Sequence, residues 1–173
     1  MIDAGRTVVA IAVGLPILLL AWYAFAVVRR QARLRAAATD LGGFHQHTGW
    51  TQPGAIAGPG FTIRIDTRRR RFRTTVVVPA QAPGNYVLDA GFFATPLDWS
   101  QAKVSNEARE ALVEWLERGA LTHHIHEDRL AAAGVNRIFV THETISTTVD
   151  GSVTDTARLR RIIDVLSRLA GPR

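Results

Sequence analysis

The chain of 173 residues contains no cysteine. This absence excludes disulfide bonds, thiolate nucleophiles and every zinc or iron–sulfur site built on cysteine ligands. Familiar catalytic motifs are also missing. The glycine-rich residues 54–60 lack the Lys-Ser/Thr pair of a phosphate-binding loop, and residues 142–146 (HETIS) have serine where a zinc protease needs its second histidine. We therefore expect a protein that is not an enzyme and that has no cofactor.

Positive charge is abundant but unevenly placed. Of the net charge of +6, residues 1–35 contribute +4 and residues 64–73 contribute +5, which leaves −3 for the rest of the chain. A chain that is mildly acidic outside two basic patches is unlike a protein that coats nucleic acid. Only Phe72 lies among the arginines of the second patch, whereas binders of single strands combine a basic groove with several aromatic rings. We expect no nucleic-acid partner.

A long apolar stretch lies near the N-terminus. Residues 7–28 contain no charged side chain, and a helix of that length covers about 33 Å, enough for a hydrocarbon core of about 30 Å. Trp22 and Tyr23 lie toward one end, where amphipathic rings favour the membrane interface. Ala10 and Gly14 form a small-xxx-small pair of the kind that lets another helix approach closely. The simpler interpretation is that alanine and glycine are common in membrane helices. The sequence predicts one transmembrane helix, with the lipid bilayer as its surroundings.

The flanking charges predict the orientation of this helix. The preceding flank has Arg6 beside Asp3, whereas the following flank has four arginines. Positive flanks stay on the cytoplasmic side, so we expect an outside N-terminus and a cytoplasmic C-terminal domain in an inner membrane of bacterial type. The four arginines, expected at the membrane surface or against a partner, are Arg29, Arg30, Arg33 and Arg35.

A cleaved signal peptide is the alternative interpretation of the same stretch. Residues 24–26 read Ala-Phe-Ala, the A-x-A pattern of a cleavage site. Three features favour an anchor instead. The apolar run is longer than a usual signal core, its amino flank is weakly positive, and two arginines would immediately follow the cut.

The chain divides into three predicted parts: a transmembrane anchor over residues 1–30, a juxtamembrane helix over 31–43 and a cytoplasmic domain over 44–173. Leu34, Ala38 and Leu41 share one helical face, and Gly42 with Gly43 supplies a stop. We expect one helix to leave the bilayer and to lay its last turns on the domain.

Alternating apolar and polar residues predict a mainly antiparallel sheet. Residues 61–67 and 72–80 alternate cleanly and place the arginines between them at the tip of a hairpin. Together with two or three packed helices, this pattern indicates an α+β domain. The hairpin arginines are Arg68, Arg69, Arg70 and Arg71. Further strands are expected at 44–50, 86–93, 120–127 and 136–145, a loop at 51–60, and helices at 105–119 and 154–171.

Histidines offer one weak candidate for a metal site. His45 and His47 have i, i+2 spacing, and so do His124 and His126. On adjacent strands, two such pairs would present imidazole nitrogens suited to zinc or copper. The simpler interpretation is that these histidines face solvent.

Three functional hypotheses follow. The first is a non-catalytic, single-pass accessory or scaffold subunit of a larger membrane complex, such as an energy-transducing one, whose partners are other integral membrane proteins. The second is a module that binds anionic lipid headgroups through its arginine patches. The third is a histidine-ligated metal-dependent enzyme.

Overall fold

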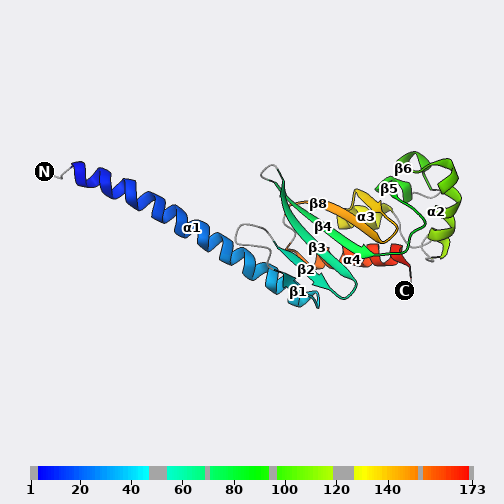
Figure 1. Cartoon of the computed structure of the whole chain (residues 1–173), viewed down its shortest axis with the longest axis horizontal. Coiled ribbons are helices and arrows are strands. Elements are labelled where there is room, and N and C mark those ends of the chain that lie inside the picture. Colours follow the sequence, from blue (N-terminus) through cyan, green and yellow to red (C-terminus); the bar gives the residue numbers. More distant parts are fainter. Residues whose placement is uncertain are drawn as a thin grey trace.

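One long helix leads into a sheet with helices on one side (Figure 1). This computed structural model describes residues 4–46, 54–68, 71–93, 97–118, 127–151 and 154–171. The helix α1 (Ala4–Asp40) is followed by an eight-stranded sheet in which every described strand pair is antiparallel. The predicted α+β class with a long apolar N-terminal helix is confirmed.

The sheet has the strand order β1-β2-β3-β4-β8-β7-β5-β6. Its strands are β1 (Phe44–Gln46), β2 (Ala55–Gly58), β3 (Phe61–Arg68), β4 (Arg71–Pro79), β5 (Tyr86–Asp89), β6 (Ala102–Lys103), β7 (Arg137–Val140) and β8 (Thr144–Asp150). The helices after α1 are α2 (Asn106–Arg118), α3 (Glu127–Ala133) and α4 (Thr156–Ala170), with short 3-10 turns η1 (Ala90–Phe93) and η2 (Trp99–Gln101).

The helix α1 has two halves with opposite surroundings. Between residues 15 and 28, large apolar side chains are uncovered by the other described residues; Leu20 is 68% exposed and Trp22 is 70% exposed. In its last turns, Leu34, Ala37 and Ala38 are buried in the domain core. Among the described residues, α1 is the one helix long and apolar enough to cross a membrane, a criterion that a signal sequence also meets. The same continuous helix therefore belongs both to an apolar arm and to the domain.

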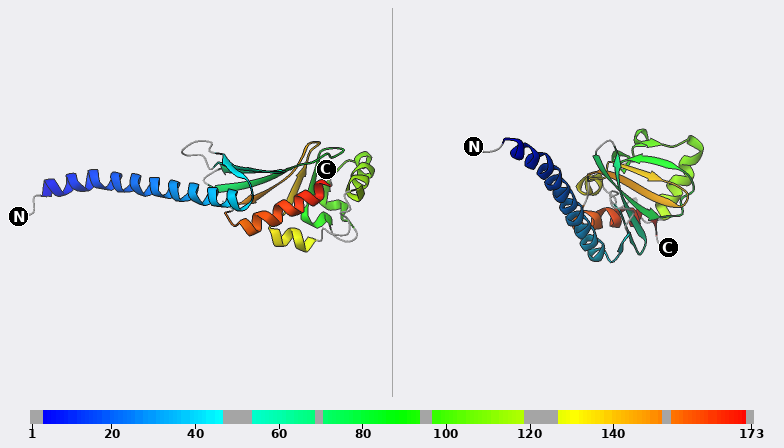
Figure 2. Two further views of the ribbon diagram at one scale, coloured as in Figure 1. Left: turned by 90° about the horizontal axis from the view of Figure 1, so that it is seen from below. Right: turned by 60° about the vertical axis from the view of Figure 1, so that its left-hand side comes forward.

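The helices α3 and α4 lie on one face of the sheet, and in the described part of the chain no helix covers the other face (Figure 2). The helix α4 packs on β4 and β8, and α3 packs on α4. Asp155 caps α4 by accepting hydrogen bonds from the backbone N–H groups of Ala157 and Arg158. The buried residues of α4 form an apolar stripe: Leu159, Ile162, Val165, Leu166 and Leu169.

The expected loop at residues 51–60 is wrong, because β2 lies within it. Ile56 is 1% exposed, and β2 pairs with β1 on one side and with β3 on the other. Glycine and proline frequency favoured a loop, but hydrogen bonds to two neighbouring strands and the burial of Ile56 outweigh the weak strand propensity of the segment. The turn that follows uses Gly60 at a φ of 85°.

The expected single strand at residues 136–145 is also wrong, because it folds into the hairpin β7–β8. Thr141 closes the turn: its backbone N–H donates to the Thr144 carbonyl over 2.8 Å, and its hydroxyl oxygen accepts from the Thr144 N–H over 3.1 Å. Threonine side chains that bond locally to backbone groups favour such turns.

Two further expectations need correction or remain open. The strand expected at 86–93 stops at Asp89, and Ala90–Phe93 form a 3-10 turn with Phe92 and Phe93 buried. The helix α3 begins at Glu127, where the end of a strand was expected. The rest of that strand, including His124 and His126, lies outside the described residues.

The burial of α1 in the core generates a prediction with an internal control. Leu34→Ala removes a fully buried side chain and should lower the free energy of unfolding by about 2–5 kcal/mol. Leu20→Ala changes the same side chain on the uncovered half of the helix and should leave domain stability nearly unchanged. Chemical denaturation of both full-length variants in detergent micelles measures the difference. Equal effects would show that α1 is not part of the core.

Candidate functional site

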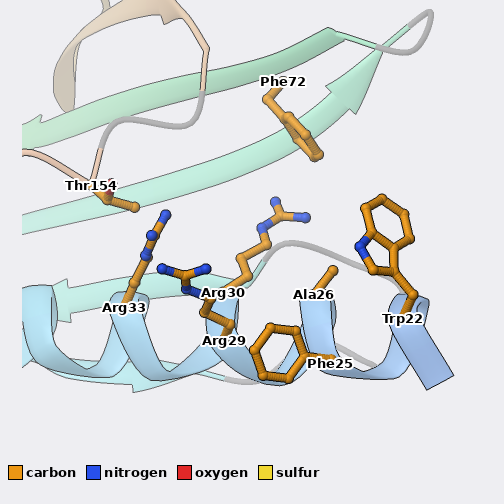
Figure 3. Close-up of a pocket in the computed structure, with 8 residues that line it drawn as sticks. All are labelled: Trp22, Phe25, Ala26, Arg29, Arg30, Arg33, Phe72 and Thr154. Carbon is orange, nitrogen blue, oxygen red and sulfur yellow. The ribbon is translucent and has the colours of Figure 1, made fainter.

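A cleft of about 390 Å³ opens between α1 and the end of the β3–β4 hairpin (Figure 3). Its volume falls in the range of small-ligand sites. One wall is α1, and the opposite wall comes from β4 and from the segment before α4. The residues that line it are Trp22, Phe25, Ala26, Arg29, Arg30, Arg33, Phe72 and Thr154.

Helical spacing brings the α1 residues to this wall. Trp22, Ala26, Arg30 and Arg33 recur at intervals of three or four residues, and such positions stack on one face of an α-helix. The apolar members come first, and the cationic members follow one turn later. The cleft therefore changes from aromatic to cationic along the helix axis, at the end of the apolar stretch.

The opposite wall is held by the register of the sheet. Phe72 is the second residue of β4 and pairs with Thr67 of β3. The carbonyl oxygen of Phe72 accepts a hydrogen bond from the Gly151 N–H over 2.7 Å, and the Thr74 hydroxyl donates to the Gly151 carbonyl over 2.7 Å. These bonds tie the chain before α4 to β4. Thr154, one residue before the cap Asp155, consequently lines the same cleft as Phe72.

Arg30 and Phe72 join the two walls. The guanidinium carbon of Arg30 lies 4.2 Å from the centre of the Phe72 ring, a cation–π contact. The Nε and Nη2 atoms of Arg30 are buried and have no hydrogen-bond acceptor among the described residues. Arg33 extends toward Thr154 (Figure 3). Arg30 is thus fixed from one side by an aromatic face, while part of its capacity to donate is unused.

The cleft is cationic. Arg29, Arg30 and Arg33 line it, and none of the described lining residues is acidic. Three like charges within two helical turns raise the local potential, and a low-dielectric aromatic wall weakens screening by water. The arrangement suits a small anion with an apolar portion.

A second cavity, of about 540 Å³, is lined by the last residues of β8 together with parts of β5 and β7, and it has a different character. Its charged groups are largely matched. The Nε atom of Arg73 lies 3.7 Å from the Oδ1 atom of Asp150. Arg137 donates two hydrogen bonds to Asp89, of which the Nη2–Oδ2 bond is 3.3 Å long. Two of its three arginines already have acidic partners, and the third, Arg158, donates to the Ala133 carbonyl over 3.2 Å, so this cavity is a weaker candidate for an anion site.

The pair in the second cavity perturbs both ionisable groups. The hydrogen bond from Arg137 is the largest effect and holds the pKa of the Asp89 carboxyl below its ordinary value. Burial opposes this shift, and the charges of Arg137 and Lys103 add to it. The same hydrogen bond raises the pKa of Arg137. The pair links β5 to β7, where Asp89 and Arg137 are directly opposite in register.

The predicted site residues are only partly brought together. Arg29, Arg30 and Arg33 lie in the cleft, whereas Arg35 is exposed outside its lining. Gly14 faces open space, since a Cβ added there would meet no atom within 4 Å. The side chain of Ala10 is not described, and Tyr23 is 51% exposed next to Trp22.

The hairpin arginines are described only in part. The backbones of Arg68 and Arg71 pair across the end of β3 and β4, as the hairpin prediction requires, while Arg69 and Arg70 lie outside the described residues. The contact of Phe72 with Arg30 had no sequence signal. Thr154 had no signal at all.

The histidine hypothesis stays a prediction. His45 lies in β1, and His47, His124 and His126 lie outside the described residues. Within the described ranges, no three histidine, aspartate or glutamate side chains are grouped so that they could hold a metal ion.

The Asp89–Arg137 pair generates a pH prediction. Asp89→Asn should lower the free energy of unfolding by about 0.5–1 kcal/mol near pH 7, since the pair is partly exposed. Because the pKa of Asp89 is lowered on folding, its stabilisation is present above the unfolded-state pKa of about 4 and is lost as pH falls through the folded-state pKa. The difference from wild type should therefore shrink toward acid pH.

Chemical denaturation at about pH 7 and about pH 3 measures this difference. Arg137→Gln and the double variant complete a thermodynamic cycle, whose coupling energy should fall in parallel. A coupling that stays constant between the two pH values would contradict the assignment of the effect to this pair.

Comparison with protein-family models, with curated proteins and with solved structures finds no match for the chain. Function is accordingly inferred from the geometry of the chain itself.

Proposed function

We propose that this protein is a non-catalytic, single-pass membrane protein whose cytoplasmic domain binds or braces a partner, as an accessory or scaffold subunit of a larger membrane complex. Its partners are other integral membrane proteins, and energy-transducing complexes are one class that such subunits serve. The N-terminus lies outside an inner membrane of bacterial type, and the arginines after residue 28 lie inside.

The observation that carries this proposal is the unbroken course of α1 from its uncovered apolar half to Leu34 in the core. A helix without an intervening linker holds the domain at a fixed height and in a fixed rotation relative to the bilayer, unlike a flexible tether. A fixed pose is of use to a domain that must meet a second membrane-bound protein. The uncovered apolar side chains of α1 also require lipid or another helix around them.

Two further features support it. Gly14 leaves open space beside α1 in which the backbone of a neighbouring helix fits closely. The sheet face opposite α3 and α4 has no helix on it in the described part of the chain (Figure 2). The cationic cleft favours a second candidate role, the binding of anionic lipid headgroups.

The proposal is tested by purifying the full chain from gently solubilised native membranes. Stoichiometric membrane-protein partners should be recovered with it, and the intact mass should be that of the whole 19.0 kDa chain rather than of a product cleaved after residue 26. A monomer without partners, or a cleaved product, would contradict the proposal.

A matched pair of insertions after Val28 tests the bracing itself. Four alanines continue the helix, lift the domain by about 6 Å and turn it by about 40°. The four residues Gly-Gly-Ser-Gly add the same number of residues but interrupt the helix. We expect the glycine insertion to lose more of the partner than the alanine insertion does. Equal recovery with both insertions would mean that the partner does not depend on a rigid α1.

A further inference from the structure

We propose that the cleft between α1 and the β3–β4 hairpin binds the phosphate headgroup of an anionic phospholipid from the bilayer that α1 enters. The inference rests on one part of the proposed function, the retention of α1 in the membrane, and is independent of any protein partner. The hairpin and the helix together form the binding site, and neither provides it alone.

The position of the cleft along α1 matches the depth of a headgroup. Its apolar members, Trp22 and Phe25, belong to the uncharged stretch, which ends at Val28. Arg30 follows Val28 by two residues, about 3 Å along the axis, and Arg33 by about 8 Å. The headgroup layer is about 5–8 Å thick on each side of the hydrocarbon core. The cationic part of the cleft thus lies at the level of lipid phosphates, and the aromatic part lies beside the upper acyl chains.

The chemistry of the cleft is that of a phosphate site. Arginine binds phosphate oxygens through two parallel N–H donors, and such charge-assisted bonds are stronger than neutral ones. The guanidinium carbon of Arg30 lies over the Phe72 ring, and this contact leaves the Nε and Nη2 donors without a hydrogen-bond acceptor among the described residues. Buried donors without acceptors are costly. A phosphate between Arg30 and Arg33 supplies acceptors to Arg30 after a rotation of its terminal torsion.

The composition of the walls favours a lipid over a free phosphate. Half of the lining residues are apolar, namely Trp22, Phe25, Ala26 and Phe72. A free phosphate ion gains nothing from these rings, whereas the glycerol and upper acyl carbons of a phospholipid cover them. Because the α1 wall is itself exposed, the cleft is open to the bilayer in which the helix lies.

The test uses the full-length protein in nanodiscs of phosphatidylcholine containing a minority of phosphatidylglycerol. Native mass spectrometry counts the lipids that remain bound when the protein is released. Wild type should retain one phosphatidylglycerol in preference to phosphatidylcholine. Arg30→Gln and Arg33→Gln should each lower this retention about tenfold, the effect of one charge-assisted hydrogen bond.

Two matched controls separate a site from diffuse attraction. Arg35→Gln removes one positive charge from the same helix at a position outside the cleft. Arg64→Gln removes one positive charge from the face of the sheet opposite the one that carries Phe72. Both should retain the lipid to within about twofold, as expected for surface charges of small individual effect. The thermal unfolding temperature in pure phosphatidylcholine nanodiscs verifies that all four variants are folded. If the Arg30→Gln variant is unfolded, the retention of phosphatidylglycerol by the Arg33→Gln variant alone tests the proposal.

Each remaining outcome counts against the proposal. Equal losses in the cleft variants and the controls would show only diffuse charge attraction. Retention without preference for phosphatidylglycerol would show that the cleft does not recognise anionic headgroups. Displacement of the lipid by millimolar inorganic phosphate would assign the cleft to a free anion. Failure of the intact chain to enter nanodiscs would contradict the membrane anchor itself, whereas loss of a protein partner leaves this result unaffected.

Discussion

The burial of Leu34, Ala37 and Ala38 against the sheet is the contact on which the rest of the structure depends. These side chains make the last turns of α1 part of the domain core, so the helix cannot swing independently of the sheet. The contact of α4 with the end of the same helix, where Arg160 donates to the Asp40 carbonyl, reinforces the connection. Wherever the apolar half of α1 lies, the domain has a defined height and rotation above it.

The cleft is a consequence of that connection. With α1 fixed on β1 and β2, its preceding turns pass the end of the β3–β4 hairpin, and Arg30 meets Phe72. The hydrogen bonds of Gly151 to β4 bring the chain before α4 to the same place. Three arginines and four apolar side chains therefore share one cavity at the end of the apolar stretch. The charge is concentrated where a bilayer offers phosphate, which links the proposed lipid site to the proposed membrane anchor.

Sequence periodicity predicted the elements whose apolar residues keep a single helical or strand period along their whole length. The helix α4, the alternation of β3 and β4 and the glycine stop after α1 all appear in the structure. It failed where tertiary pairing outweighs local preference, as in the glycine-rich β2, or where a short turn divides an apparent strand, as at Thr141. The cleft could not be predicted, because Arg30 and Phe72 are far apart in the chain. Nothing in their local patterns indicates that α1 passes the hairpin.

The most direct test of the account is whether α1 and the domain form one rigid body in a bilayer. Because the chain has no cysteine, Leu20→Cys on the uncovered half of α1 and Arg64→Cys on the exposed face of β3 provide the only two sites for thiol-reactive spin labels. Pulsed electron paramagnetic resonance on the doubly labelled protein in nanodiscs reports the distribution of distances between them. A single narrow distribution is predicted. A broad or multiply peaked distribution would show that the helix bends or pivots beside the domain and would contradict the account.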